Sequence, residues 1–205
     1  MKIVIATRNR HKAVELQTLL HGVGYDAVRL DEIDPDGKIP EVEETGITFK
    51  ENALLKAHAI AKATGLPSVA DDTGLEVDAL GGAPGIFSAR YAGENCTYED
   101  NVKKLLRELS DVADDRRTAR FKTVAVYAHK ETELSAEGVV EGVITEKAEG
   151  FGGFGYDPVF SVWDMKKTYA QLADEEKNRV SHRGKAIRSL IEKLRENGLI
   201  ADNPS

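Results

Sequence analysis

The sequence predicts an α/β protein with a mixed central β-sheet flanked by helices. Two observations support this: strand and helix patterns alternate along the first third of the chain, and the middle is rich in strand patterns. There, Thr118–His129 and Glu133–Ile144 read as paired strands. The 205 residues contain no internal repeat and no linker-like segment, so we expect a single domain over residues 1–205.

The first elements follow from short apolar patterns. Lys2–Ala6 reads as a buried strand, and Arg10–Leu20 places its apolar residues on one helical face. Two glycines, Gly22 and Gly24, are expected to end that helix. Tyr25–Leu30 then reads as a second strand.

An acidic segment and a well-marked helix come next. Asp31–Gly46 holds seven acidic residues, one lysine and two prolines, and is predicted to be a loop. Thr48 and Glu51 have the spacing of a capping box, in which each side chain accepts a backbone N–H of the other residue. The helix that they open is expected to end at Gly65.

The remaining elements are a short strand and two helices. Ser68–Ala70 is predicted to be a strand that ends at Asp71-Asp72-Thr73-Gly74. A helix is expected from about Thr97 to Leu109, opened by a Thr-x-x-Asp pattern. The last helix, from about His182 to Asn197, carries an apolar stripe, and Ser181 is its expected cap.

Charge and composition exclude several classes of protein. The 28 basic and 35 acidic residues give a net charge of −7, which disfavours binding to nucleic acid or to an anionic membrane. The single Cys96 cannot form an intrachain disulfide and is expected to be a bystander rather than a catalytic thiol. The longest apolar run, Val124–Ala128, is far too short to span a bilayer, and no signal peptide pattern is present. We therefore expect a cytoplasmic protein.

The first strand and the first helix are joined by a candidate anion site. A loop in this position of an α/β fold presents backbone N–H groups and a helix dipole to an anion. The loop is not a Walker A motif. Its alternative interpretation is a polar turn with solvated charges. The residues concerned are Thr7, Arg8, Asn9, Arg10, His11 and Lys12.

Adjacent acids after the strand at Ser68–Ala70 form a candidate metal site. Asp71 and Asp72, with the hydroxyl of Thr73 beside them, offer the oxygen ligands that a hard divalent cation prefers. The alternative is an Asx turn. The acidic loop offers further donors, although a charge run is commonly a solvated face: Glu41, Glu43 and Glu44.

A glycine-rich loop and a late cluster of donors complete the candidate site. Gly150–Gly155 allows close approach of a flat ligand, and an aromatic ring in such a loop can stack on a base; a flexible surface hairpin is the alternative. The aromatic residues there are Phe151, Phe154 and Tyr156. Lys177 and Ser181-His182-Arg183-Gly184 supply donors for carbonyl oxygens or phosphate, or form an ordinary charged helix terminus.

Taken in order, six blocks of the sequence resemble the inosine triphosphate pyrophosphatase family, the Ham1/RdgB-like group that acts on non-standard purine nucleotides. The resemblance extends from Lys2 to about Leu194. The blocks are Thr7-x-Asn9-x-x-Lys12, Glu43-Glu44-Thr45-Gly46-x-Thr48-Phe49-x-Glu51-Asn52-Ala53, Ala70-Asp71-Asp72-Thr73-Gly74-Leu75, Gly81-Gly82-Ala83-Pro84-Gly85-Ile86-x-Ser88-Ala89-Arg90-Tyr91, Gly152-Gly153-Phe154-Gly155-Tyr156-Asp157-Pro158 and Ser181-His182-Arg183-Gly184.

The resemblance implies an activity and an architecture. The expected reaction is the Mg²⁺-dependent hydrolysis of dITP, ITP and XTP to the nucleoside monophosphate and pyrophosphate, which removes damaged purines from the nucleotide pool. The expected fold has two lobes with a nucleotide cleft between them, and the expected assembly is a homodimer.

The resemblance also implies roles for individual residues. Glu43 and Asp72 would bind the metal, Asp72 would be the general base, and Thr73 would contact the substrate. The triphosphate would be held by Thr7, Arg8, Asn9, Arg10, His11 and Lys12. The base would be recognised by Phe154, Gly155, Tyr156, Asp157, Lys177, His182 and Arg183. The chain departs from the family at Thr73, where serine is most common, and at three positions where small residues are common: Arg8, Arg10 and His11.

Base selectivity has a physical explanation. Hypoxanthine and xanthine present an acceptor oxygen at position 6, where adenine presents an amino donor, so donors from Lys177, His182 or Arg183 would favour the first two. Two other functions stay open. A Maf-type pyrophosphatase of different base preference should lack the Ser-His-Arg-Gly block, and a nucleotide-binding module without turnover should lack Asp72 or Glu43.

Overall fold

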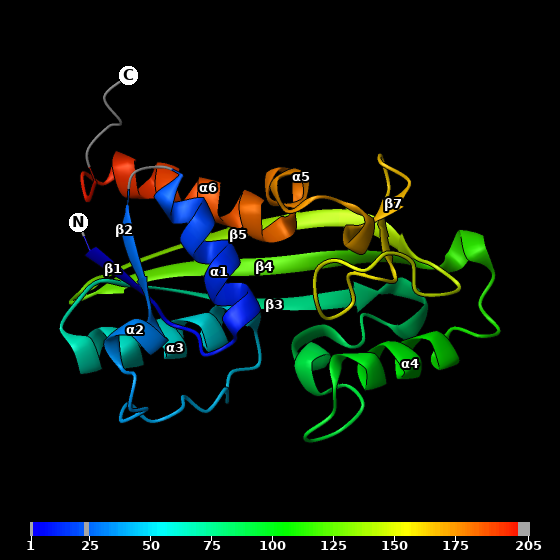
Figure 1. Ribbon diagram of the computed structural model, residues 1–205, viewed down its shortest axis with the longest axis horizontal. Helices are drawn as coiled ribbons and strands as arrows, with labels where there is room; N and C mark the ends of the chain where they lie inside the picture. The colour runs from blue at the N-terminus through cyan, green and yellow to red at the C-terminus, as the bar shows by residue number, and fades with distance from the viewer. Residues whose placement is uncertain (1, 23–24, 201–205) are drawn as a thin grey trace. The chain divides into compact units, whose positions relative to one another are not determined.

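The computed structural model describes residues 2–22 and 25–200 (Figure 1). The predicted helix end at Gly24 lies outside the described residues. The helices and strands are β1 (Lys2–Ile5), α1 (Arg10–His21), β2 (Asp26–Arg29), α2 (Leu30–Ile33), α3 (Phe49–Thr64), β3 (Ser68–Val77), α4 (Tyr98–Glu108), β4 (Thr118–His129), β5 (Thr132–Ile144), β6 (Phe160–Val162), β7 (Lys167–Thr168), α5 (Asp174–Val180) and α6 (His182–Glu196). Short 3₁₀ turns occur at Asp78–Leu80, Gly85–Arg90, Asp114–Arg116 and Tyr169–Gln171.

The strands of residues 2–22 and 25–200 form one sheet of seven strands in the order β2-β1-β3-β4-β5-β6-β7. β1 is parallel to both β2 and β3, whereas β6 is antiparallel to β5 and to β7. The predicted mixed α/β sheet is therefore confirmed.

The chain divides into two compact units. Unit 1 consists of Met1–Asp72, Thr123–Gly138 and Arg183–Ser205, and unit 2 consists of Thr73–Lys122 and Val139–His182. The boundary within β3 falls between Asp72 and Thr73, so these neighbouring candidate residues belong to different units.

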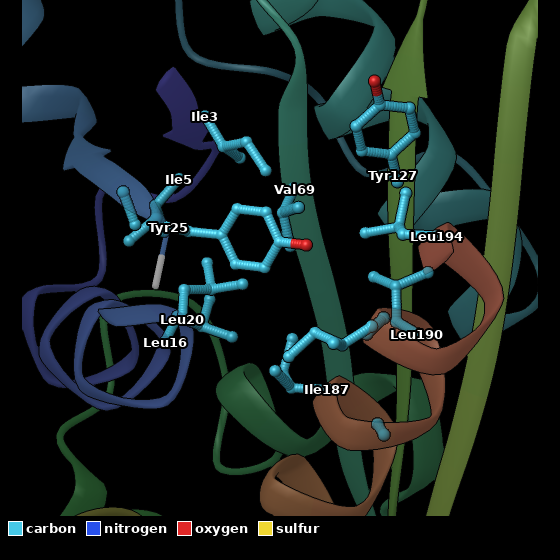
Figure 2. Packing of buried hydrophobic residues seen from close by; sticks show 14 of the residues in the cluster. Ile3, Ile5, Leu16, Leu20, Tyr25, Val69, Tyr127, Ile187, Leu190 and Leu194 are labelled. Carbon is cyan, nitrogen blue, oxygen red and sulfur yellow. The ribbon is translucent and has the colours of Figure 1, made fainter. Parts of the chain in front are cut away.

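The core of unit 1 is built between the sheet and two helices. The apolar stripes of α1 and α6 pack with buried residues of β1, β3 and β4, as Figure 2 shows. The labelled members are Ile3, Ile5, Leu16, Leu20, Tyr25, Val69, Tyr127, Ile187, Leu190 and Leu194. α3 lies on the other side of these strands from α6 (Figure 1), and Ser68 Oγ donates to the carbonyl of Ala57 in α3 at 2.5 Å.

The core of unit 2 joins α4 to the outer strands and is partly aromatic. Leu105 of α4 is fully buried in the same cluster as Val140 and Ile144 of β5. The ring of Phe121 lies 4.8 Å from that of Phe160, edge to face, and stacks on Tyr169 at 5.7 Å. These contacts place the start of β4 beside the segment that leads to α5.

Several predicted elements are confirmed, and the capping signals show why. Thr48 Oγ1 accepts the N–H of Glu51 at 3.1 Å, and Glu51 accepts the N–H of Thr48 at 3.2 Å, so the predicted capping box starts α3. Thr97 caps α4 in the same manner. The strand predicted at Thr118–His129 has the bounds of β4.

Other predictions were wrong. The strand at Ser68 does not end at Ala70, because β3 continues through the predicted turn to Val77. Asp71 and Asp72 are buried there, and cationic side chains compensate their charge, as described below. The acidic segment is not wholly a loop, since α2 extends to Ile33. α5 was not predicted, because its seven residues are mostly charged.

No helix within residues 2–22 and 25–200 is long and apolar enough to cross a membrane.

Candidate functional site

The turn between β1 and α1 is fixed by its own side chains. Asn9 is the N-cap of α1, and its Oδ1 accepts the backbone N–H groups of His11 at 3.1 Å and Lys12 at 3.2 Å. Thr7 Oγ1 accepts the N–H of Asn9 at 3.2 Å. The turn therefore opens a capped helix at the end of a buried strand, which is the expected setting for an anion. Arg10 and His11 lie exposed on the first turn of α1.

Arg8 belongs to a different set of contacts. Its guanidinium lies 3.0 Å from Asp34 Oδ2 and donates to the carbonyl of Ile39 at 2.5 Å. Asp34 also accepts the N–H groups of Ile39 at 2.9 Å and Lys38 at 2.7 Å. The Ile39 N–H, assisted by Arg8, lowers the pKa of Asp34. Arg8 thus ties the first turn to the acidic segment.

The two adjacent acids of β3 belong to two separate networks. Successive side chains of a strand point to opposite faces, so Asp71 and Asp72 meet different partners. Asp71 Oδ2 lies 3.4 Å from Lys12 Nζ and 3.1 Å from Arg183 Nε. Asp72 Oδ1 lies 3.4 Å from Lys56 Nζ. β3 therefore presents one carboxylate to α1 and α6 and the other to α3.

The Asp71 network is almost completely buried. Arg183 is 2% exposed and binds Glu15 of α1 through its second nitrogen. Burial opposes its charge, but the carboxylates of Asp71 and Glu15 raise the pKa of Arg183 above its usual value. Burial lowers the pKa of Lys12, and Asp71 partly offsets this effect. Lys12 thus lies beside the capped start of α1, with Asp71 as its partner.

The Asp72 network joins β3 to α3 and to the acidic segment. Lys56 Nζ lies 2.6 Å from Glu44 Oε1 and 3.4 Å from Asp72 Oδ1. Asn52 Nδ2 donates to Asp72 Oδ2 at 3.3 Å, and Asn52 Oδ1 accepts the N–H of Gly46 at 2.8 Å. Lys56 and Asn52 of α3 therefore each contact both Asp72 and the end of the acidic segment.

In this network, burial and the neighbouring charges act in opposite directions on the pKa of Asp72 and on that of Lys56. Burial raises the pKa of Asp72 above its usual value, and the ammonium groups of Lys56 and Lys12 offset only part of that rise. Burial opposes the charge of Lys56, but the carboxylates of Asp72 and Glu44 raise its pKa. A carboxylate whose pKa is raised in this manner is a better proton acceptor than an ordinary aspartate.

Sequence reasoning missed Asn52 and Lys56 as site residues. The signal was present, because the two polar residues are four apart and therefore share one face of α3. The same helix buries Ala53 and Ala57 beside them. Asn52 is itself 1% exposed, and a buried amide requires partners.

The donor set around Asp72 is suited to a partly hydrated cation. Among the described residues, no group of three or more His, Cys, Asp or Glu side chains gathers to form a protein cage for a metal ion. Mg²⁺ is commonly held by one or two carboxylates, with waters and substrate phosphates completing its six ligands. Asp72 and the nearby acidic segment fit that requirement. The side chain of Glu43 is exposed, and its metal role stays a prediction.

In unit 2 the glycine-rich loop is organised by a buried ion pair. Asp157 Oδ2 accepts Lys177 Nζ at 2.7 Å and the N–H of Phe154 at 2.8 Å. Lys177 and Asp157 are 4% and 3% exposed. Lys177 Nζ also lies 5.0 Å from the centre of the Phe154 ring, within cation–π range. The pair thus fixes both the backbone and the ring of Phe154.

Gly153 is required for this arrangement. It has φ +71°, and a Cβ at this position would lie 2.1 Å from Asp157 Oδ2. Gly155 also has a positive φ, of +63°. The loop therefore needs glycine for its backbone conformation and for space beside the ion pair.

His182 and Tyr156, which the sequence led us to expect in base recognition, are both buried. The imidazole of His182 stacks on Phe121 at 4.5 Å, and its Nδ1 lies 3.4 Å from the hydroxyl of Tyr169. The Tyr156 hydroxyl donates to the carbonyl of Ser88 at 2.9 Å, and burial raises its pKa. Tyr156 is 4% exposed and is therefore a core residue of unit 2.

The predicted site residues thus form one group in each unit. Unit 1 contains Thr7 to Lys12, Glu43, Asp72 and the side chain of Arg183. Unit 2 contains Thr73, Phe154 to Asp157, Lys177 and His182. The placement of Arg183 among the carboxylates of unit 1 was not anticipated from the sequence.

Comparison with known proteins identifies close relatives. The family description that matches residues 3–193 is that of the Ham1 family. The dITP/XTP pyrophosphatase of Salmonella typhimurium is 53% identical over 197 residues, which cover 95% of this chain and 98% of that protein. The protein of the same name from Escherichia coli K12 is 51% identical over the same share of each chain.

Solved structures agree with these sequence matches. The Ham1 protein of Staphylococcus aureus is 42% identical with a TM-score of 0.82, covering 96% of this chain and 100% of that one. A HAM1 protein from Coxiella burnetii is 41% identical with a TM-score of 0.83, covering 96% and 99%.

Proposed function

Because the chain belongs to the Ham1 family, we propose that it hydrolyses dITP, ITP and XTP to the nucleoside monophosphate and pyrophosphate. The observation that carries the proposal is the pair of networks on β3, in which Asp72 and Asp71 each meet cations from neighbouring helices. Such an arrangement provides both a proton acceptor and positive charge for a polyphosphate.

Unit 1 carries the phosphate chemistry. A triphosphate repels an attacking water, so its negative charge must be compensated before hydrolysis can proceed. The capped start of α1 offers backbone N–H groups, and Lys12 offers an ammonium. Arg183 holds Asp71 in place, and Asp71 in turn holds Lys12. The positive groups are thus fixed before substrate binds.

Asp72 is the proposed general base. Its raised pKa suits it to accept a proton from the attacking water, and Lys56 and Asn52 hold its two oxygens. Asp72 and Glu43 would hold Mg²⁺. When bound, that ion would neutralise phosphate charge and help to align the scissile bond.

Unit 2 carries base recognition. The Phe154 ring offers a surface for stacking on a purine, and Asp157 holds the Lys177 ammonium beside it. A donor at this point pairs with the 6-oxygen of hypoxanthine or xanthine and opposes the 6-amino group of adenine. His182, stacked on Phe121, supplies a second nitrogen donor. The buried Tyr156 supports the loop from within the core.

The proposed assembly is a homodimer that binds neither nucleic acid nor membranes. The net charge of −7 opposes phosphate polymers and anionic lipid surfaces. Light scattering coupled to size exclusion should give twice the mass of the chain, and a monomer mass would contradict the dimer.

One assay tests the proposed function. Pyrophosphate release is measured from ITP, XTP, dGTP and dATP, with Mg²⁺ and with excess chelator. We expect turnover of ITP and XTP that requires Mg²⁺, and little turnover of dATP. Preference for pyrimidine nucleotides, added as a further substrate set, would instead indicate a Maf-type activity. Binding of ITP without any pyrophosphate release would indicate a nucleotide-binding module.

A further inference from the structure

Tyr98 is an aromatic residue of unit 2 that lies beside the glycine-rich loop. It is the first residue of α4, and its side chain is 39% exposed. Its ring centre lies 5.9 Å from that of Phe154, with 48° between the ring planes. This separation is within the range in which aromatic pairs attract each other.

The backbone at Tyr98 is held by an extensive set of hydrogen bonds. The preceding Thr97 caps α4 and exchanges hydrogen bonds with Asp100 in a capping box. Asn101 is 2% exposed, accepts the N–H of Ala92 at 2.7 Å and donates to the carbonyl of Ala89 at 3.2 Å. These hydrogen bonds hold the start of α4 in place, and with it the backbone of Tyr98 beside the loop.

The Phe154 ring contacts side chains from two helices outside its own loop. Lys177 of α5, held by Asp157, lies 5.0 Å from the ring centre. Tyr98 contacts the ring from α4. Glycines at 150, 152, 153 and 155 leave the backbone around Phe154 with little side-chain support of its own.

We propose that Tyr98 is a positioning residue for base recognition: its ring holds the Phe154 ring at the angle at which a purine stacks. This inference rests on the proposed function and deepens it. Because Tyr98 acts through Phe154, its effect should depend on the base and not on the triphosphate. It should also appear in substrate binding rather than in the chemical step.

The expected size of the effect follows from the aromatic pair. Contacts of this kind contribute about a 2- to 10-fold change in an equilibrium constant. Tyr98→Ala should therefore raise the KM for ITP and XTP by about 2- to 10-fold and leave kcat unchanged. Tyr98→Phe keeps the ring and should restore the KM of the unaltered protein.

A matched control is available in the same unit. Phe87 is 53% exposed and has Arg90 5.3 Å from its ring centre, so Phe87→Ala also removes an exposed aromatic side chain and one of its contacts. It should leave KM unchanged. Inorganic tripolyphosphate, which has no base, is used as a competitive inhibitor, and its inhibition constant should be the same in Tyr98→Ala and the unaltered protein.

Binding is measured separately from turnover, by calorimetry with an α,β-imido analogue of ITP. A weaker dissociation constant in Tyr98→Ala, restored in Tyr98→Phe, supports the proposal. An unchanged dissociation constant overturns it, as does an equal loss of affinity for tripolyphosphate. If the unaltered protein binds the analogue but releases no pyrophosphate from ITP, the proposed function fails, whereas the comparison of variants still decides the role of Tyr98.

Discussion

Replacing the buried Arg117 should destabilise unit 2 far more than replacing its partly exposed neighbour Arg120. Arg117 is 4% exposed and donates to three backbone carbonyls: Nε to Ile144 at 2.9 Å, Nη1 to Leu109 at 3.0 Å and Nη2 to Thr145 at 3.0 Å. Two of these acceptors lie at the end of β5, where the chain leaves for the glycine-rich loop. Arg117→Met keeps an apolar chain of similar length and removes every donor.

The expected loss in the free energy of unfolding depends on which carbonyl acceptors lose their hydrogen-bond partner. The carbonyl of Leu109 also accepts the N–H of Val112 at 3.0 Å and therefore keeps a hydrogen bond. The carbonyl of Ile144 loses a charged donor in a buried position, at about 1–3 kcal/mol. The partly buried carbonyl of Thr145 also loses one, at about 1 kcal/mol, the lower end of that range. The free energy of unfolding should therefore fall by about 2–4 kcal/mol, a large share of the stability of an ordinary domain.

Arg120 is the control, and it carries more ion pairs. Its guanidinium lies 3.0 Å from Asp78, 3.2 Å from Glu141 and 3.8 Å from Glu76, but its side chain is 30% exposed. Water and salt screen such pairs, so Arg120→Met should lower the free energy of unfolding by no more than about 1 kcal/mol.

Urea unfolding followed by circular dichroism measures both variants, and hydrogen–deuterium exchange locates the loss. With a slope of about 2–3 kcal/mol per molar urea, the midpoint for Arg117→Met should fall by about 1–2 M. Faster exchange should be confined to unit 2. If Arg117→Met lost less stability than Arg120→Met, buried carbonyl acceptors would matter less in unit 2 than partly exposed ion pairs.

Three further predictions concern the site. Asp72→Asn should fold and bind ITP but lose at least about 100-fold in kcat, because the amide accepts no proton; near-normal pyrophosphate release would remove Asp72 from the mechanism. Lys56 lowers the pKa of Asp72, so Lys56→Gln should move the acid limb of the pH profile of kcat to higher pH; a limb that stays in place or moves to lower pH would contradict this. Gly153→Ala places a Cβ 2.1 Å from Asp157 Oδ2 and should raise the KM for ITP without changing that for tripolyphosphate; equal increases for both would show a general loss of structure.

Local signals in the sequence predicted much of the fold. The capping boxes at Thr48 and Thr97 located the starts of α3 and α4, because a cap depends only on residues three apart. The end of β3 could not be found in this manner. Asp-Asp-Thr-Gly is typical of a turn, and the strand continues through it because Lys12, Lys56 and Arg183 compensate the acids from distant parts of the sequence.

Residue patterns in the chain predicted the α/β class, the turn between β1 and α1, the family and the residue types on which the proposed chemistry depends. How those residues are divided followed only from the packing of the folded chain. That packing assigned Asp71 and Asp72 to separate networks, because neighbouring side chains of a strand face opposite ways. It also brought Asn52 and Lys56 to Asp72, and Arg183 to Asp71, because such contacts depend on packing between elements far apart in the chain.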